Sequence, residues 1–305
     1  MTTISALETA CALARRRSLL AASMALGLAV LLTGCSTESP RPHDDEPSAV
    51  EPPLGPISSP TEPSQIVRPI DQYVPSTQLV LQLVRAERAK QSECLRGSDE
   101  RTIDWPLDEE GAVPFIEGAR RDEVVRSELW GFFDPGSAAV RGYSRPADVP
   151  GALPSGIPAG VTFDEFTECS LSAHGAFPLG NGGGAYSAAY ISSLPDGGPP
   201  VPTADSRVEA VVAAWSACMA SRGFASPDPI SALIDPRWQS GLASVGPEQI
   251  ATATADMDCK AETNLVGIEL AVQSAYDQVY IEAHREALDG MADLLAAYLG
   301  EEAAG

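Results

Sequence analysis

The sequence is poor in the residues from which many enzymes and metal sites are built. Its 305 residues include three histidines, and lysine stands only at positions 90 and 260, so arginine supplies most of the positive charge. No HxxxH, HExxH or CxxC pair is present. Zinc enzymes and zinc fingers need such spacings. We therefore expect no metal and no other cofactor.

Lysine and arginine together are also few. The chain carries 20 Lys and Arg against 42 Asp and Glu, a formal net charge of −22. Loss of residues 1–34, which we interpret below as a signal peptide with two net positive charges, would leave −24. Nucleic acids are bound mainly through Lys and Arg that neutralise phosphates. We expect no nucleic-acid partner.

Common catalytic motifs are absent or incomplete. The stretch GNGGGA (180–185) lacks the lysine of a phosphate-binding loop, and Ser244 in GLASVG does not have the GxSxG spacing. Cys169 and His174 could form a thiol nucleophile and base, but export to an oxidising compartment favours oxidation of that thiol. We expect no catalytic residue and predict that the protein is not an enzyme.

Carboxylates are numerous enough to keep one enzymatic alternative open, an envelope hydrolase that uses a carboxylate pair. Those beside cysteines are Asp164, Glu165, Glu168, Asp256 and Asp258. Helix capping and solvation explain them without catalysis. The acidic group His43 to Glu46 is not expected to bind metal because it lies in a segment without fixed geometry, and no EF-hand loop pattern is present.

The chain has no apolar run of the roughly 20 residues that a membrane span requires. A 15-residue apolar run (18–32) follows three arginines and ends at Leu32, Thr33, Gly34 and Cys35. This order of positive, apolar and small residues is typical of a secretory signal peptide, predicted at 1–34. The cysteine after Leu-Thr-Gly resembles the lipobox of bacterial lipoproteins. The resemblance implies cleavage before Cys35 and a diacylglyceryl group, such as one carrying palmitate, on its thiol.

Such an anchor would hold the protein on the outer face of the cell membrane. Each buried methylene contributes about 0.8 kcal/mol, and two acyl chains suffice for stable attachment. The next segment is rich in Pro, Ser and acidic residues and has no hydrophobic periodicity. We therefore predict a disordered tether over residues 35–72, which holds a folded domain (73–305) away from the lipid surface.

Four cysteines remain in the folded part, and export makes disulfides the default. A zinc site is the alternative, but no histidine flanks them and no pair is closely spaced. Helical patterns at 79–106 and 206–227 each contain a cysteine and are followed at a distance by a second one. This repeated order favours disulfide bonds between Cys94 and Cys169 and between Cys218 and Cys259, although four cysteines allow three connectivities.

The patterns predict a mainly α fold of two disulfide-braced helical halves, about 73–178 and 203–305, packed on a long C-terminal helix. Apolar residues recur at helical spacing in 207–222, with Ser206 and Glu209 as a capping box, and again from Leu265 to Leu299. A Gly- and Pro-rich segment (175–205) is predicted to be a flexible connector, and long irregular loops complete the domain. A short hairpin is expected at 103–105 or 113–116.

Four segments carry a resemblance to a known family: LWGFFDPGSAAVRGYSRP (129–146), WSACMASRGFASPDP (215–229), MDCKAETNLVGIELAVQSAY (257–276) and YIEAH (280–284). The Trp-x-x-Cys-Met helix followed by a Cys-Lys helix resembles exported lipoproteins of actinobacteria, a family without an established biochemical function. The resemblance implies no catalytic residues. We expect a non-enzymatic binding or structural role toward an unknown envelope protein or ligand. A solute or peptide receptor is the main alternative.

Overall fold

The computed structural model describes residues 50–97, 102–103, 105–145, 156–179, 183–239 and 245–302. The predicted signal peptide, the lipobox, Cys35 and the acidic group at 43–46 lie outside these residues. Helices dominate the described part, as predicted. Its strands are limited to a hairpin of β1 (Arg126–Ser127) and β2 (Gly131–Phe132).

The α-helices are α2 (Thr77–Arg96), α3 (Glu109–Val125), α4 (Pro135–Arg141), α5 (Phe163–Gly175), α6 (Ser206–Ser221), α7 (Pro229–Leu233), α8 (Pro236–Gln239), α9 (Pro247–Thr263), α10 (Leu265–Ala283) and α11 (Arg285–Glu302). The 3-10 turns are η1 (Pro63–Gln65), η2 (Pro69–Tyr73), η4 (Ala185–Ala189), η5 (Ile191–Ser193) and η6 (Pro195–Gly197).

Short-range sequence signals explain where several of these helices begin. Thr162 and Glu165 form a capping box at α5, and Pro247 occupies the first turn of α9.

Two local predictions were wrong. The cap of α6 is Asp205, whose carboxylate accepts from the Arg207 backbone N–H, whereas Ser206 is already helical. The hairpin is also misplaced, because Val113 to Ile116 lie within α3. Gly131 has a φ of +63° and follows a tight turn, which makes 126–132 the segment that can reverse direction.

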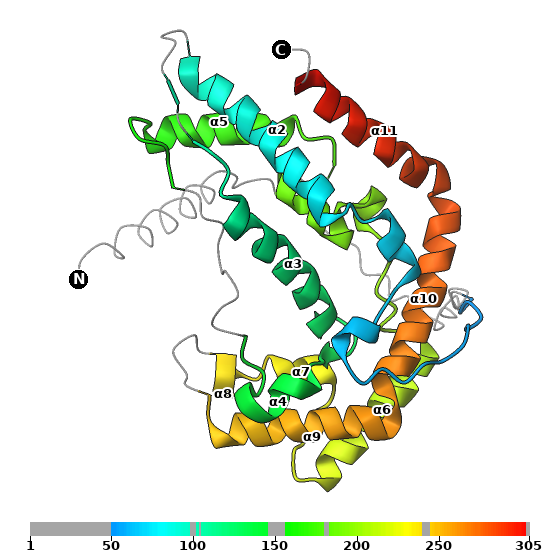
Figure 1. The fold of residues 1–305 in the computed structure, drawn as a ribbon. Coiled ribbons are helices and arrows are strands. Elements are labelled where there is room, and N and C mark those ends of the chain that lie inside the picture. The colour runs from blue at the N-terminus through cyan, green and yellow to red at the C-terminus, as the bar shows by residue number, and fades with distance from the viewer. Residues whose placement is uncertain are drawn as a thin grey trace, which may run out of the picture. The chain divides into compact units, whose positions relative to one another are not determined.

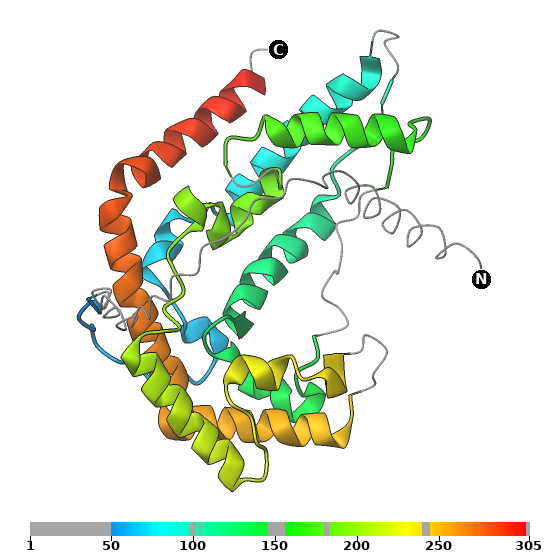
Figure 2. The ribbon, with the colours of Figure 1, turned by 180° about the vertical axis from the view of Figure 1, so that it is seen from behind.

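The apolar core consists of two clusters. The first joins the hairpin region, α6, α7, α9 and the start of α10, with Trp215 fully buried in it. The second joins α2, η4, the end of α10 and α11. Figures 1 and 2 show α2, α5 and α11 at one end of the folded part and α4, α8 and α9 at the other.

These clusters cut across the two expected halves. The segment from Val125 to Tyr143, expected in the first half, packs with α6 and α9 of the second. Conversely, α11 comes from the second half and packs against α2 of the first. The physical reason is that α3 and α10 both extend from one cluster to the other, so each half contributes to both cores.

The C-terminal helix is interrupted rather than continuous. α10 ends at Ala283 and α11 begins at Arg285, with His284 between them at φ −112° and ψ 16°. The His284 ring stacks on Tyr280, and its Nδ1 lies 2.9 Å from the Tyr280 carbonyl oxygen. Since a carbonyl only accepts, Nδ1 donates there, and the same carbonyl also accepts from the His284 backbone N–H at 2.9 Å.

Residues 50–72 were predicted as the second part of a disordered tether, and this prediction was wrong. They pack against the body together with residues 73–76, and we call residues 50–76 the strap. Ile66 belongs to the first cluster, and Ile70 is fully buried in the second. Four well-spaced apolar residues therefore help to dock this proline-rich chain, the other two being Leu54 and Tyr73.

The described part of the predicted connector is likewise packed. Residues 183–200 form the turns η4, η5 and η6, and three alanines of η4 are buried against α2. Small side chains lower the apparent hydrophobicity of this segment but permit close approach to α2, which composition alone does not indicate.

Candidate functional site

Both predicted disulfide pairs are present. Cys94 of α2 bonds Cys169 of α5 with a Cα–Cα distance of 5.6 Å, and Cys218 of α6 bonds Cys259 of α9 at 5.7 Å. Both distances fall within the usual range for disulfides. Each bridge ties two helices that also pack directly on one another.

The alternative of a Cys169 nucleophile is therefore contradicted, since its sulfur is bonded. The imidazole of His174 lies instead near Glu87, with Nε2 and Oε1 at 3.9 Å. Glu87 is buried and accepts from the Ala185 backbone N–H at 3.0 Å. Burial raises the pKa of Glu87 to about 7 and lowers that of His174. This pair fastens η4 to α2 and α5.

One of the predicted carboxylates, Asp256, lies in a buried polar cluster. Its carboxylate accepts from Lys260 Nζ at 2.8 Å, from Trp215 Nε1 at 2.9 Å and from the Tyr143 hydroxyl at 3.4 Å. Lys260 also donates to the Phe132 carbonyl at 2.5 Å, so the cluster joins α6, α9 and the hairpin. Asp256 and Lys260 are at most 1% exposed, which excludes substrate from this pair.

Glu269 of α10 faces the same cluster and is the least satisfied buried group in the described residues. It is 0% exposed, and neither carboxylate oxygen has a hydrogen-bond partner among the residues described. Burial raises the pKa of Glu269 to about 8, against the opposing charge of Lys260. The other predicted carboxylates lie on helix surfaces: Asp258 pairs with Arg222, and Glu165 caps α5.

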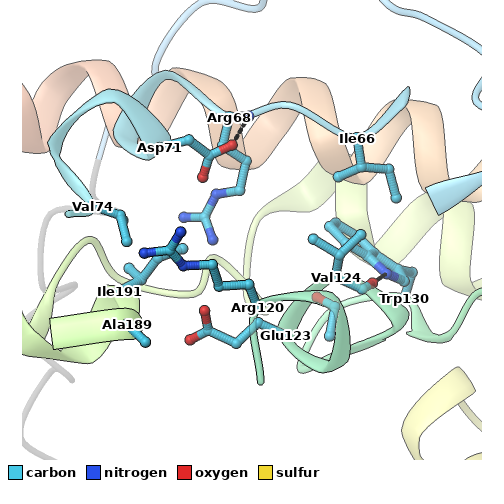
Figure 3. Close-up of a pocket in the computed structure, with 11 residues that line it drawn as sticks. Ile66, Arg68, Asp71, Val74, Arg120, Glu123, Val124, Trp130, Ala189 and Ile191 are labelled. Atoms are coloured by element: carbon cyan, nitrogen blue, oxygen red, sulfur yellow. Dashed lines mark hydrogen bonds between the residues drawn. The ribbon is translucent and has the colours of Figure 1, made fainter. Parts of the chain in front are cut away.

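A pocket of about 250 Å³ lies between the two core clusters and gathers charged side chains (Figure 3). Its walls come from the strap, α3, the hairpin loop and the η4–η5 segment. The lining residues are Ile66, Arg68, Asp71, Val74, Arg120, Glu123, Val124, Ser127, Trp130, Ala189 and Ile191. A second hollow of about 300 Å³ shares Arg68, Glu123, Ser127, Trp130 and Ile191 with it. The two hollows therefore adjoin at these shared residues.

Arg68 is held rigidly at the strap side of this pocket. Its guanidinium donates from Nη2 and Nε to the two oxygens of Asp277 in α10, at 2.6 and 3.0 Å. The Asp277 carboxylate is fully buried and also accepts from Gln273 at 3.0 Å. This leaves Nη1 of Arg68 outside these bonds, and Figure 3 shows its guanidinium directed toward that of Arg120.

Arg120 and Glu123 lie three positions apart on α3, so both side chains reach the pocket floor and bring opposite charges to it. Arg120 donates to Thr77 Oγ1 at 3.2 Å and to the Pro75 carbonyl, while its buried Nε has no partner among the described residues. Glu123 accepts from the Ile191 backbone N–H, and burial raises its pKa to about 7. The positive charges of Arg68 and Arg120 oppose that rise.

This arrangement differs from a hydrolytic carboxylate pair. Asp71 and Glu123 share the pocket, but the guanidinium groups of Arg68 and Arg120 lie between them in Figure 3. The order of charges is thus acid, base, base, acid. Such a sequence matches a ligand that carries both signs of charge. Ile66, Val74 and Ile191 supply apolar walls, and Trp130 is fixed by donating from Nε1 to the Val124 carbonyl at 2.8 Å.

Sequence reasoning missed all four charged residues of the pocket. A signal existed on α3, where Ala112 and Ile116 are buried at helical spacing and Arg120 and Glu123 continue the same face. Charged residues on the apolar side of a helix indicate a buried polar site. No comparable signal marks Arg68 and Asp71, because they lie in a segment whose composition predicts disorder.

No helix among the described residues is long and apolar enough to span a membrane. Within the same residues, no group of three or more His, Cys, Asp or Glu side chains is arranged to hold a metal ion. Comparisons of the chain with protein-family models, with curated proteins and with solved structures find no match.

Proposed function

We propose that the protein is a lipid-anchored receptor of the cell envelope that binds a small zwitterionic solute, such as a free amino acid or dipeptide, in the pocket between the two core clusters. The pocket carries this proposal, because Arg68, Asp71, Arg120 and Glu123 converge on it from two different segments. Convergent polar groups in a largely apolar recess are typical of ligand sites.

The charges define how the ligand would lie. A carboxylate would be received by the spare donors of Arg68 and by Arg120, since guanidinium groups match carboxylate geometry. An ammonium group would be received by the carboxylate of Glu123, with Asp71 at the rim. A zwitterion would place a group of matching charge beside the carboxylate of Glu123 and beside the guanidinium of Arg120, whereas a ligand with one charge would match only one of them.

The size of the pocket limits the ligand further. At about 250 Å³ it is smaller than the pockets of about 300–1,000 Å³ that hold drug-sized molecules. A free amino acid would fit, and a dipeptide would extend into the adjoining hollow of about 300 Å³. The apolar walls favour a ligand with a short aliphatic side chain.

Isothermal titration calorimetry on the purified protein tests the proposal. The titrants are the free proteinogenic amino acids and dialanine, each compared with its N-acetylated and its amidated form. We expect binding of at least one zwitterion and its loss in both singly charged forms. Equal binding of an acetylated form, or no heat with any titrant, would reject the proposed ligand class.

The location is a separate part of the proposal. It is supported by the lipobox pattern ending at Cys35 and by the resemblance of residues 215–229 and 257–284 to exported lipoproteins. Metabolic labelling with an alkyne fatty acid should label the wild-type protein and not Cys35→Ser, while Cys11→Ser should be labelled normally. Labelling of the Cys35→Ser variant would place the lipid elsewhere.

A further inference from the structure

The strap is both a wall of the pocket and the direct continuation of the chain that would carry the lipid. It contributes Ile66, Arg68, Asp71 and Val74 to the lining of the pocket. Its first residue, Val50, is 15 positions after Cys35. Any pull between the membrane and the folded body must therefore pass through the strap before it reaches α2.

The outer end of the strap is held by exposed and part-buried polar contacts and by the partly buried Leu54. Glu51 accepts from the backbone N–H and hydroxyl of Ser206, at 2.7 and 2.9 Å, and Arg207 donates to the Pro52 carbonyl at 2.8 Å. Further along, the Ser58 carbonyl accepts from Asn264 Nδ2 at 2.9 Å. The exposed contacts among these, made by Glu51 and Asn264, contribute about 1 kcal/mol or less each.

The inner end is held more firmly. Ile66 and Ile70 are buried in the two core clusters, and Arg68 forms the two-point ion pair with the fully buried Asp277. A pull on the N-terminal side thus loads the weak contacts first and the pocket-lining contacts last. Between these regions a hollow of about 540 Å³ separates parts of the strap from α10, so the two surfaces are not packed along their whole length.

Gly267 of α10 makes this docking possible. A Cβ at position 267 would lie 1.9 Å from the Ser58 carbonyl oxygen, far inside van der Waals contact. The missing side chain lets the strap backbone lie against the helix. Glycine costs a helix about 1 kcal/mol relative to alanine, which makes a purely helical role for Gly267 unfavourable. The glycine is therefore explained by the strap.

From this arrangement we infer that the strap is a detachable wall of the pocket, and that a pull on the lipid-anchored end of the chain releases the ligand by lifting Ile66, Arg68, Asp71 and Val74 away from α3. The inference rests on the proposed function for its ligand and for its lipid anchor, whereas detachment of the strap under force can be tested without either. Because coupling is reciprocal, a ligand that contacts the strap must also hold it in place.

Force spectroscopy on the full chain, held at residue 49 and at the C-terminus, tests the mechanical part without any ligand. We expect a low-force step before global unfolding, with a gain of at most roughly 95 Å for the 27 residues of the strap at about 3.5 Å each. Gly267→Ala should weaken that step, because its Cβ forces the strap backbone at Ser58 away from α10 before any pull is applied. Gly290→Ala is the matched control, since a Cβ there meets nothing within 4 Å, and it should keep the step.

Glu51→Ala gives a second variant that leaves every core and pocket residue in place. It should lower the force of the first step. Extension in a single step by the wild-type protein, or an unchanged low-force step in Gly267→Ala, would overturn the detachable wall.

The coupling to binding is measured with the tightest zwitterion from the calorimetric panel. Its affinity should fall about tenfold or more in Gly267→Ala and stay unchanged in Gly290→Ala, in keeping with usual allosteric couplings. Should no zwitterion bind, the proposed function fails, while the force experiment still decides whether the strap detaches. Unchanged affinity in Gly267→Ala, together with a weakened low-force step, would reject the coupling.

Discussion

Arg68 and Asp277 are 209 positions apart in the sequence and form a two-point ion pair, with oxygen–nitrogen distances of 2.6 and 3.0 Å. The carboxylate is fully buried, whereas the guanidinium is 19% exposed at the pocket. One pair thus fixes the strap to α10 and orients a cationic group toward the ligand space. Gln273 supports the same carboxylate and also donates to the Pro200 carbonyl at 3.1 Å.

Replacement of Arg68 by methionine should lower the free energy of unfolding by about 3 kcal/mol, because it leaves Asp277 buried without its cation. Urea denaturation followed by circular dichroism measures the change. The control is Arg85→Met, whose partner Glu109 is exposed, and its cost should stay below about 1 kcal/mol. Equal losses in the two variants would show that the Asp277 carboxylate finds another partner.

Glu123 should give ligand binding a characteristic pH dependence. Its pKa is raised to about 7, so it is mostly neutral below that pH and ionised above it. A ligand ammonium needs the ionised form, and affinity should therefore rise by about tenfold from about pH 6 to about pH 8. Calorimetry at a series of pH values measures this.

The matched variants for this prediction lie on the same helix. Glu123→Gln should bind weakly at every pH and lose the dependence, while Glu117→Gln, an exposed change of the same charge on α3, should retain it. Affinity that rises with falling pH would indicate that protonated Glu123 donates to the ligand, and that the ligand is an anion.

The sequence was sufficient to predict those features that depend on residues close together in the chain or on a disulfide bond. The α5 capping box, the proline at the start of α9 and the apolar stripe of α6 all depend on residues within a few turns. Disulfide pairing was predictable because each helical unit repeats the same order of elements. These signals placed most helices and both bridges, and hence the mainly α fold.

The pocket was not predictable for the opposite reason. Its strap wall is determined by single apolar residues, Ile66 and Ile70, whose burial depends on surfaces formed by several other segments, among them α10, which begins at Leu265. Proline-rich composition correctly indicates that the strap has no regular helix of its own, but it does not show whether a folded surface exists for it to dock on. The sequence position of Gly267 does not indicate a docking surface, and its role is recognised only because the structure places the Ser58 carbonyl beside it.

The two disulfides should each contribute about 4 kcal/mol, as the chain-entropy model gives for loops of 41 and 75 residues. The double variants Cys218→Ala with Cys259→Ala and Cys94→Ala with Cys169→Ala are compared by guanidinium unfolding. Non-reducing peptide mapping of the wild type supplies the control on pairing. An unfolding midpoint that does not respond to dithiothreitol in the wild type would contradict this contribution.

Glu269 should make the protein less stable as the pH rises. Its folded pKa is about 8 against an ordinary value of 4.5. Between these values the unfolded chain has lost the proton that the folded chain still holds, so the free energy of unfolding falls by up to about 1.4 kcal/mol per pH unit. Below about pH 4.5 both states are protonated and the full stability is present.

Glu269→Gln removes that titration and should flatten the decline between about pH 5 and about pH 8, as measured by urea unfolding at each pH. Glu282→Gln is an exposed substitution of the same type on α10, and its profile should follow that of the wild type. If the Glu269→Gln profile also followed the wild type, the proton taken up by the folded protein would reside on Asp256 or be shared through Lys260. The charge of Lys260 opposes the rise in the Glu269 pKa. Asp256→Asn would then be the variant that flattens the profile.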